Sequence, residues 1–279
     1  MSSAGMLIAL LMFCTAVVSA APAQPPPPDS SDPTRGLDLT EVELAHSYEA
    51  DFSRPLELMN EAGLFESERR VRVPPARIDW ILEGRGNAHT EAGRLVLSNG
   101  GNDVVLWNTH RFPADFLLEF SVLPHDANKG LNIVFFAAMG RKGGGIFDLS
   151  QPKRDGRFRA YHSGGLDAYH VSYWATDEDG NARSTAHIRK NYGFHRVAVG
   201  KDFITGQGPG PHRVRVLKLN GNIEVEVNGR IAVRWHDDGR TFGPVLGEGF
   251  IGLRQMAYTQ DCRYTHFRVW AAKARVPTT

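Results

Sequence analysis

Cysteine is scarce in this sequence, which has only two among 279 residues, Cys14 and Cys262. Cys14 lies in an apolar leader that we expect to be removed, so the remaining chain has one thiol and no intramolecular disulfide. An exported fold without disulfides fits a bacterial periplasm or exterior, and its stability must come from a hydrophobic core. Cys262 lies within a strand pattern and is expected to be a small buried apolar residue.

The sequence also lacks an excess of charge of one sign. Its 32 lysines and arginines balance 31 aspartates and glutamates, with a net charge of +1. This balance gives no polybasic region of the kind that predicts a nucleic-acid partner. The apolar run over residues 6–18 is too short to cross a bilayer, and no other run approaches that length. We therefore predict neither nucleic-acid binding nor a membrane span.

The first residues resemble a secretory signal peptide. The apolar run ends at Val18-Ser19-Ala20, a small-residue cleavage pattern. Cys14 is not preceded by the small residues expected of a lipoprotein signal, so we predict cleavage rather than lipidation. We expect a signal peptide over residues 1–20, a proline-rich linker over 21–36 and a single folded domain over 37–279. The predicted location is secreted or periplasmic.

Helical periodicity is nearly absent, and only residues 53–65 show weak helical spacing. Elsewhere the apolar residues alternate with period two, and Asn220-Gly221 is a strong hairpin signal. The expected strands cover residues 77–82, 94–97, 103–107, 115–123, 131–138, 169–175, 184–190, 212–219, 222–227, 230–236, 249–256 and 263–270. The continuous apolar run at 131–138 predicts a strand covered on both faces. The pattern predicts an all-β fold, an antiparallel β-sandwich of jelly-roll type.

Chemically active side chains are concentrated between residues 161 and 194. Strict alternation over 169–175 places His170, Ser172 and Trp174 on one face of a strand and the tyrosines on the other. A second strand over 184–190 carries Arg189, and a short acidic turn joins the two strands as a hairpin. His162 lies on the loop before this hairpin. Imidazole, guanidinium, hydroxyl and a flat aromatic on one surface suit an anionic or polyhydroxyl ligand.

Several motifs support a family resemblance. The order NGNIEVEVNGR, GPVLGEGFIGLRQMA and YTHFRVW is similar to the closing strands of the concanavalin A-like lectin/glucanase superfamily. The blocks YHSGGLDAYHVSYW and HIRKNYGF resemble the YesU-like family, a bacterial domain of unknown function. The resemblance covers residues 80–270. It implies the concanavalin A-like jelly roll, and it implies a connection with pectin and rhamnogalacturonan breakdown without indicating a reaction.

The first functional hypothesis is an exported enzyme that cleaves acidic, uronate-containing polysaccharide by β-elimination. That reaction needs a cation to neutralise the carboxylate, a base to remove the α-proton and an acid to protonate the leaving oxygen. The candidates for these roles, in the same order, are Arg189 helped by Lys190, His170 or His162, and Tyr173 or Tyr169.

Two other hypotheses stay open. One is a carbohydrate-binding module or lectin that uses the same surface without turnover. The other is a glycoside hydrolase with Glu119 and a second acid that the sequence does not identify. The substrate-binding candidates, which are polar, charged or aromatic residues of the expected strands, are Lys190, Ser172, Trp174, Trp107, Glu119 and Arg254.

No cofactor is predicted, and no metal-ligand spacing such as His-Glu-x-x-His occurs. The glycine-rich stretch 141–145 is not followed by Gly-Lys-Ser/Thr, so we interpret it as a mobile loop rather than a phosphate cradle. A structural calcium is possible at oxygen-rich loops; the candidate ligands are Asp148, Asp155 and Asp167. Glu224 and Glu226 are interpreted as solvent-facing hairpin residues rather than a catalytic pair.

Overall fold

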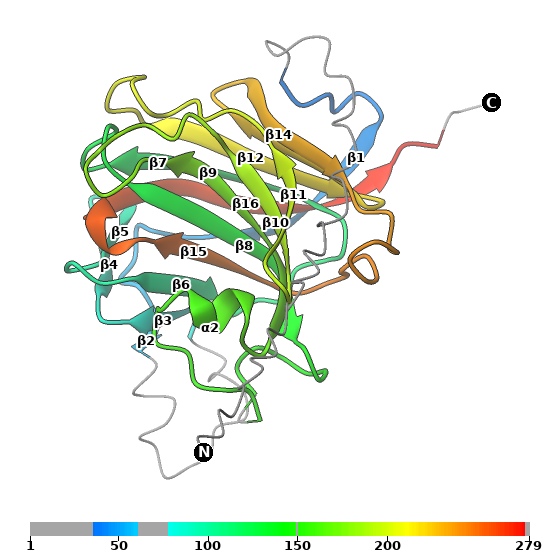
Figure 1. Ribbon diagram of the computed structural model, residues 1–279, viewed down its shortest axis with the longest axis horizontal. Coiled ribbons are helices and arrows are strands. Elements are labelled where there is room, and N and C mark those ends of the chain that lie inside the picture. Colours follow the sequence, from blue (N-terminus) through cyan, green and yellow to red (C-terminus); the bar gives the residue numbers. More distant parts are fainter. Residues whose placement is uncertain (1–35, 61–77, 149, 277–279) are drawn as a thin grey trace, which may run out of the picture.

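The computed structural model describes residues 36–60, 78–148 and 150–276, which form two β-sheets packed face to face (Figure 1). The first sheet contains, in spatial order, β14 (Arg230–His236), β13 (Asn222–Val227), β12 (His212–Leu219), β7 (Phe116–Pro124), β16 (Cys262–Ala274), β5 (Arg94–Ser98) and β4 (Asn87–Glu91), with β1 (Val42–Glu49) paired to β16. The second contains β11 (His195–Val199), β10 (His187–Asn191), β9 (Leu166–Ala175), β8 (Leu131–Gly140), β15 (Phe250–Gln255), β6 (Val104–Asn108), β3 (Trp80–Gly84) and β2 (Leu58–Asn60).

The predicted antiparallel β-sandwich is confirmed. Every strand pair is antiparallel except β2 with β3, which is parallel. Among the described residues, the two short helices are α2 (Arg159–His162) and the 3-10 turn η1 (Ala257–Thr259). The predicted Asn220-Gly221 hairpin is present, because β12 and β13 pair from Leu219 opposite Asn222. The predicted helix over 53–65 is wrong for residues 53–60, which form a turn and β2, and its other residues lie outside the described part.

The main core lies between the sheets and follows the alternation of the strands. On β7, Phe116, Leu118, Phe120 and Val122 are fully buried in this core, as the period-two pattern predicted. Cys262 is also fully buried, and burial raises the pKa of its thiol to about 12. The core therefore includes the thiol as an inert apolar group.

A second core covers the outer face of the second sheet. Residues 141–148 and 150–165, hereafter together the covering segment, cross this face and include α2 (Figure 1). Its Ile146 and Tyr161 pack with Trp107 and Phe135 of the strands below, and all four are buried. This layer explains why β8 is apolar on both faces, as the run 131–138 predicted. Much of the sheet face that a ligand would otherwise reach is thereby filled.

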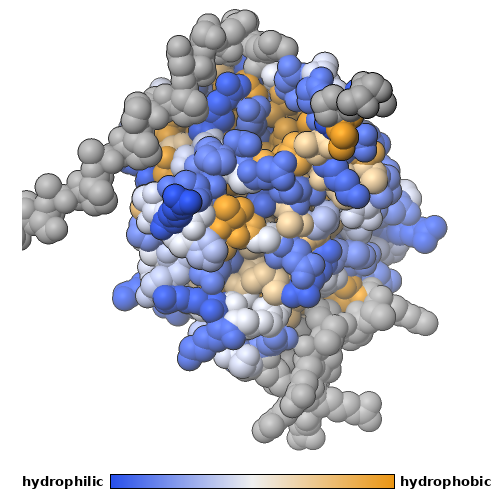
Figure 2. Space-filling view, turned by 90° about the vertical axis from the view of Figure 1, so that its right-hand side faces the viewer, coloured by the Kyte–Doolittle hydropathy of each residue, from blue (hydrophilic) through white to orange (hydrophobic). Residues whose placement is uncertain are grey.

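The leader expected over residues 1–20 and the linker expected over 21–36 lie outside the described residues, apart from Gly36. Within the described ranges, no helix has both the length and the apolar character needed to cross a membrane. The face seen in Figure 2 is largely hydrophilic, with apolar residues exposed in small areas between polar ones.

Candidate functional site

The predicted hairpin that carries the polar side chains is β9–β10, and β11 extends it. In the register of these strands, Arg189 lies opposite His170 on β9 and opposite Arg196 on β11. Two pairs further along, His187 lies opposite Ser172. The predicted common face of His170, Ser172 and Arg189 is therefore confirmed.

Trp174 does not share that face, so this part of the prediction is wrong. The pairing of β8 with β9 shifts between Asn132, which lies opposite Trp174, and Ile133, which lies opposite Ser172. This β-bulge adds one residue to β9 and reverses the alternation beyond it. The Trp174 ring consequently packs in the core between the sheets, where a Cβ atom on Gly130 would meet it at 2.4 Å. It cannot serve as a sugar platform on the His170 face.

His170 is fully buried rather than open to a ligand. Its ring lies against Phe135, Phe158 and Phe194, with ring centroids 5.4, 5.5 and 5.9 Å away. Its Nδ1 is 2.9 Å from Nδ2 of Asn191, and among the described residues no group bonds its Nε2. Burial, and then the neighbouring positive charges, hold the pKa of His170 well below its usual value. The geometry thus opposes the predicted role of His170 as a base that touches substrate.

A buried ion pair holds the covering segment on the sheet. Arg154 donates through Nη2 to Glu83 Oε1 at 2.5 Å and through Nε to Oε2 at 3.1 Å. The same carboxylate accepts hydrogen bonds from Tyr161 Oη at 2.8 Å and Trp107 Nε1 at 2.9 Å. Trp107 is therefore fully buried and hydrogen-bonded to Glu83, so its assignment as a substrate-binding candidate is wrong.

Arg254 is buried beneath the same segment. Its Nη2 donates to Asp103 Oδ2 at 2.6 Å, and its guanidinium lies 4.4 Å from the centroid of the Phe158 ring. No part of its side chain is exposed. Arg254 therefore cannot contact a substrate directly while the Phe158 ring covers it.

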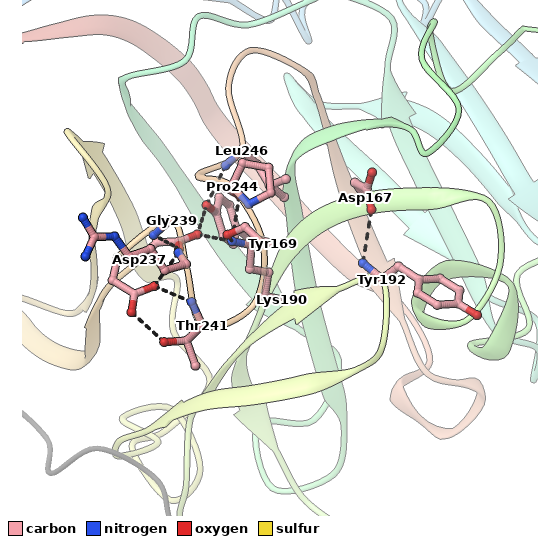
Figure 3. A network of polar contacts seen from close by, with 12 residues as sticks. Asp167, Tyr169, Lys190, Tyr192, Asp237, Gly239, Thr241, Pro244 and Leu246 are labelled. Carbon is pink, nitrogen blue, oxygen red and sulfur yellow. Dashed lines mark hydrogen bonds and ion pairs between the residues drawn. The ribbon is translucent and has the colours of Figure 1, made fainter. Parts of the chain in front are cut away.

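Lys190 and the two tyrosines of β9 lie on the opposite side of the sheet from His170. Lys190 Nζ donates to Asp237 Oδ2 at 2.6 Å and to the carbonyl oxygens of Gly243 and Pro244, both at 2.8 Å (Figure 3). Tyr169 Oη donates to the same carboxylate. All three donors of the ammonium are used, so the expectation that Lys190 assists Arg189 is wrong.

Tyr173 lies in the core between the sheets, 5.7 Å from the ring of Phe120, and burial raises its pKa. Tyr169 is likewise buried, and its pKa is raised by burial and by the Asp237 carboxylate. Because His170 faces the other way, neither tyrosine can act as the acid partner of His170 on one substrate.

Glu119 is separated from these residues because it belongs to β7 of the first sheet, opposite Arg215 and Arg268. Glu226 also differs from its predicted solvent-facing position. Its carboxylate is fully buried, pairs with Arg215 and Arg213, and accepts a hydrogen bond from the Leu37 backbone at 2.9 Å. The N-terminal part of the described chain covers it, which alternation within β13 does not reveal.

The accessible part of the site is a group of arginine and histidine side chains at the β10–β11 edge, beside α2. We call it the basic face; it consists of Arg159, His162, His187, Arg189 and Arg196. Within the described ranges, none of the three arginines pairs with a carboxylate. Arg189 instead donates to the carbonyl of Phe194 at 3.0 Å and lies 3.9 Å above that ring.

The two histidines of the basic face are kept neutral by their surroundings. Burial lowers the pKa of His187 to about 4, with help from the charges of Arg189 and Arg196. His162 is half-buried, with Nδ1 2.6 Å from Ser163 Oγ, and burial followed by the charges of nearby arginines lowers its pKa. The local potential is therefore positive, and it favours an anionic ligand.

Sequence reasoning missed Arg159 and Arg196. The strand that carries Arg196 was not predicted, although the alternation of HRVAV at 195–199 is a signal for it. Arg159 belongs to the covering segment, whose position depends on tertiary contacts.

The three aspartates proposed as calcium ligands each accept a hydrogen bond from a different group. Asp148 accepts from the Gly145 backbone at 2.9 Å, Asp155 from Arg157 Nε at 2.6 Å, and Asp167 from the Tyr192 backbone at 3.4 Å (Figure 3). In the described ranges, no three His, Cys, Asp or Glu side chains gather closely enough to hold a metal. We therefore assign no role to calcium on the basis of the described residues.

Comparison with known proteins agrees with this architecture. A family model described as Domain of unknown function (DUF1961) matches residues 66–269. The chain belongs to this family. An uncharacterized protein, YesU of Bacillus subtilis (strain 168), is 36% identical over 202 residues, which make up 71% of this chain and 91% of that protein. The predicted resemblance to the YesU-like family is thereby confirmed.

Two solved structures illustrate the fold of this DUF1961 member. A protein of unknown function with a galectin-like fold from Bacillus subtilis has a TM-score of 0.65 and 30% identity, covering 84% of this chain and all of that one. A variant of SCLam, a non-specific endo-beta-1,3(4)-glucanase from family GH16, has a TM-score of 0.50 and 11% identity, covering 86% and 97%. The second likeness concerns the fold alone.

Proposed function

We propose that this protein acts outside the cytoplasm and binds uronate-containing oligosaccharide or polysaccharide at the basic face. The observation that carries the proposal is the direct opposition of Arg189 and Arg196 across β10–β11, without a carboxylate partner in the described part of the chain. Like charges directly opposite in a sheet destabilise it by up to about 1 kcal/mol. A bound carboxylate offsets this repulsion and satisfies both guanidinium groups.

The chemistry of the neighbouring groups fits an acidic sugar. Guanidinium groups bind carboxylates through two parallel hydrogen bonds, which orient the ligand as well as attract it. The Tyr192 ring, 40% exposed, follows β10 directly; the Arg141 guanidinium lies 3.6 Å from its centroid, so at most the other face of the ring is open to a ligand. Aromatic rings commonly border sites with one apolar and one polar side, as a pyranose presents. A jelly-roll fold shared with a glucanase is compatible with a carbohydrate ligand.

Binding without turnover is the function that the geometry supports best, because His170 and Tyr173 are buried on opposite sides of β9. One observation favours β-elimination as a second candidate. His162 is half-buried and kept neutral by burial and by nearby charges, including that of Arg189, so it can accept a proton beside a carboxylate-neutralising cation.

The test is a calorimetric titration with oligogalacturonate and with a neutral oligogalactan of equal length. We expect binding of the acidic ligand only, weakened at least about tenfold by Arg189→Gln, since a charge-assisted hydrogen bond contributes about 1.5–3 kcal/mol. Arg263→Gln, on the first sheet, is the matched control. Equal affinity for both ligands, or wild-type affinity in Arg189→Gln, would refute the proposal. Ultraviolet absorbance of an unsaturated uronide during incubation would select elimination over binding alone.

A further inference from the structure

A pair of polar residues lies beside the arginines of the basic face. Ser172 on β9 is directly opposite His187 on β10, two pairs along the strands from His170 and Arg189. Directly opposite side chains of neighbouring strands have Cβ atoms about 4.5–5.5 Å apart. Residues two positions apart on a strand point to the same face and are separated by about 7 Å. Ser172 and His187 therefore share the face of Arg189 and lie within the reach of a ligand that Arg189 holds.

Neither side chain of this pair has a hydrogen-bond partner within the described ranges. Ser172 is 8% exposed and His187 is half-buried, so both open to solvent over a small area only. Their next neighbours in the same row of the sheet are Ile133 on β8 and Val199 on β11, whose side chains neither donate nor accept hydrogen bonds. Polar groups at such depth are normally hydrogen-bonded. The pair is therefore available to a polar group of a ligand.

The chemistry of the pair suits a hydroxyl group rather than a second carboxylate. Burial, and then the charges of Arg189 and Arg196, lower the pKa of His187 to about 4, so its imidazole is neutral at pH 7. A neutral imidazole has one N–H donor and one nitrogen acceptor, and a serine hydroxyl both donates and accepts. A sugar hydroxyl also donates and accepts, whereas a carboxylate only accepts. The pair can therefore use its full hydrogen-bonding capacity only on a group that carries its own proton.

The end of the same row offers an apolar contact. Val199, opposite His187 at the edge of the sheet, is 44% exposed. The C–H groups of a pyranose ring are apolar, and their contact with an exposed aliphatic side chain removes apolar surface from water. A sugar whose carboxylate is bound by Arg189 can thus direct a ring hydroxyl to Ser172 and His187 and lay C–H groups against Val199.

We propose that Ser172 and His187 recognise a free ring hydroxyl of the uronate whose carboxylate Arg189 holds, so that the basic face selects uronates without O-acetyl groups. The inference rests on the proposed function, because Arg189 supplies the carboxylate contact. An O-acetyl group removes the hydroxyl proton and adds bulk above two side chains with little exposed area. Sites that hydrogen-bond a ligand hydroxyl discriminate strongly against analogues without it, because the polar groups of the site are then left unpaired.

The experiment is a calorimetric titration with trigalacturonate and with the same trimer O-acetylated on its ring hydroxyls. We expect the wild type to bind the free trimer at least about tenfold more tightly than the acetylated one. Ser172→Ala and His187→Leu should each weaken binding of the free trimer by about three- to tenfold, the loss of one neutral hydrogen bond, and leave the acetylated trimer unaffected. His187→Gln keeps a donor and an acceptor and should retain most of the selectivity. Ser121→Ala, at a half-buried serine of β7 in the first sheet, is the matched control.

The outcomes separate this inference from the proposed function. Arg189→Gln should weaken binding of both trimers and leave the ratio of their affinities unchanged, because it removes only the carboxylate contact. If the wild type binds the two trimers equally, or if Ser172→Ala and His187→Leu weaken both to the same extent, the hydroxyl contact falls and the basic face stands. If the wild type binds neither trimer, both proposals fall.

Discussion

Arg189 on β10 lies directly between two basic residues, His170 on β9 and Arg196 on β11. The three are equivalent in register, yet they differ in access, because His170 is fully buried and Arg196 is exposed. Side-chain exposure increases across the three adjacent strands, from the buried imidazole of His170 to the exposed guanidinium of Arg196. The accessible cations therefore lie at the sheet edge, and the buried groups lie beneath the covering segment.

The first prediction concerns the pKa of His187, which is about 4. Arg196→Gln removes a nearby positive charge, so the pKa rises; it stays below 6.5, because burial is the larger cause of the shift. NMR titration of the imidazole measures it. Arg196→Lys keeps the charge and is the control, expected to leave the pKa close to 4. An unchanged pKa in the glutamine variant would show that Arg196 does not act on this face.

The second prediction concerns acid stability and follows from His170. Its folded-state pKa is lowered by burial and then by the charges of Arg189 and Arg254, so below pH 6.5 the unfolded chain binds the proton first. The stabilisation is present above pH 6.5 and is lost as pH falls, by about 1.4 kcal/mol per pH unit for this group. His170→Gln should reduce that slope between pH 6.5 and 5 in urea unfolding. The same change at exposed His125 is the control, and an unchanged slope in His170→Gln would contradict the assignment.

The third prediction tests the attachment of the covering segment. Glu83→Gln breaks the buried ion pair of Glu83 with Arg154 and should lower the free energy of unfolding by about 3–5 kcal/mol. Glu91→Gln is the matched control, because its carboxylate is 61% exposed and 3.9 Å from Arg263, a contact that contributes less than about 1 kcal/mol. Chemical denaturation measures both. Similar small losses in the two variants would mean that the ion pair does not anchor the segment.

The fourth prediction concerns Lys190, which the structure places in a buried network. Lys190→Met leaves Asp237 charged and without its cation, so a loss of about 3–5 kcal/mol in unfolding free energy is expected. Lys190→Met/Asp237→Asn should recover part of this loss, because no uncompensated charge remains. Affinity of the folded fraction for oligogalacturonate should match the wild type; weaker binding with unchanged stability would instead make Lys190 a ligand contact.

The sequence predicts side-chain faces correctly where a strand stays regular. On β9, alternation holds from Tyr169 to Ser172, and it fails at Trp174 because the bulge opposite Asn132 and Ile133 shifts the pairing. A bulge depends on how two strands meet, so the residues of one strand do not reveal it. The same limit applies to Glu226. Its carboxylate is covered by the segment around Leu37, which lies 189 residues away in the sequence.

The covering segment shows why the site itself was only partly predictable. Glycine-rich residues 141–145 indicate a loop, but they do not indicate where the following residues pack. Tyr161 and Ile146 are isolated apolar residues, and Arg154 meets Glu83 across 71 residues of sequence. Such contacts depend on how the strands are assembled into the sheet, so the local sequence does not show them. As a result, residue types indicated a candidate region, but the burial of His170, Trp107 and Arg254 could not be inferred from them.

The covering segment also has a consequence for ligand access. It fills the outer face of the second sheet over Trp107 and Phe135, so a ligand that reaches this part of the sandwich meets loop side chains instead of the strands. Selectivity in this part would then depend on a stretch of chain that can change in sequence without disturbing the pairing of the sheet.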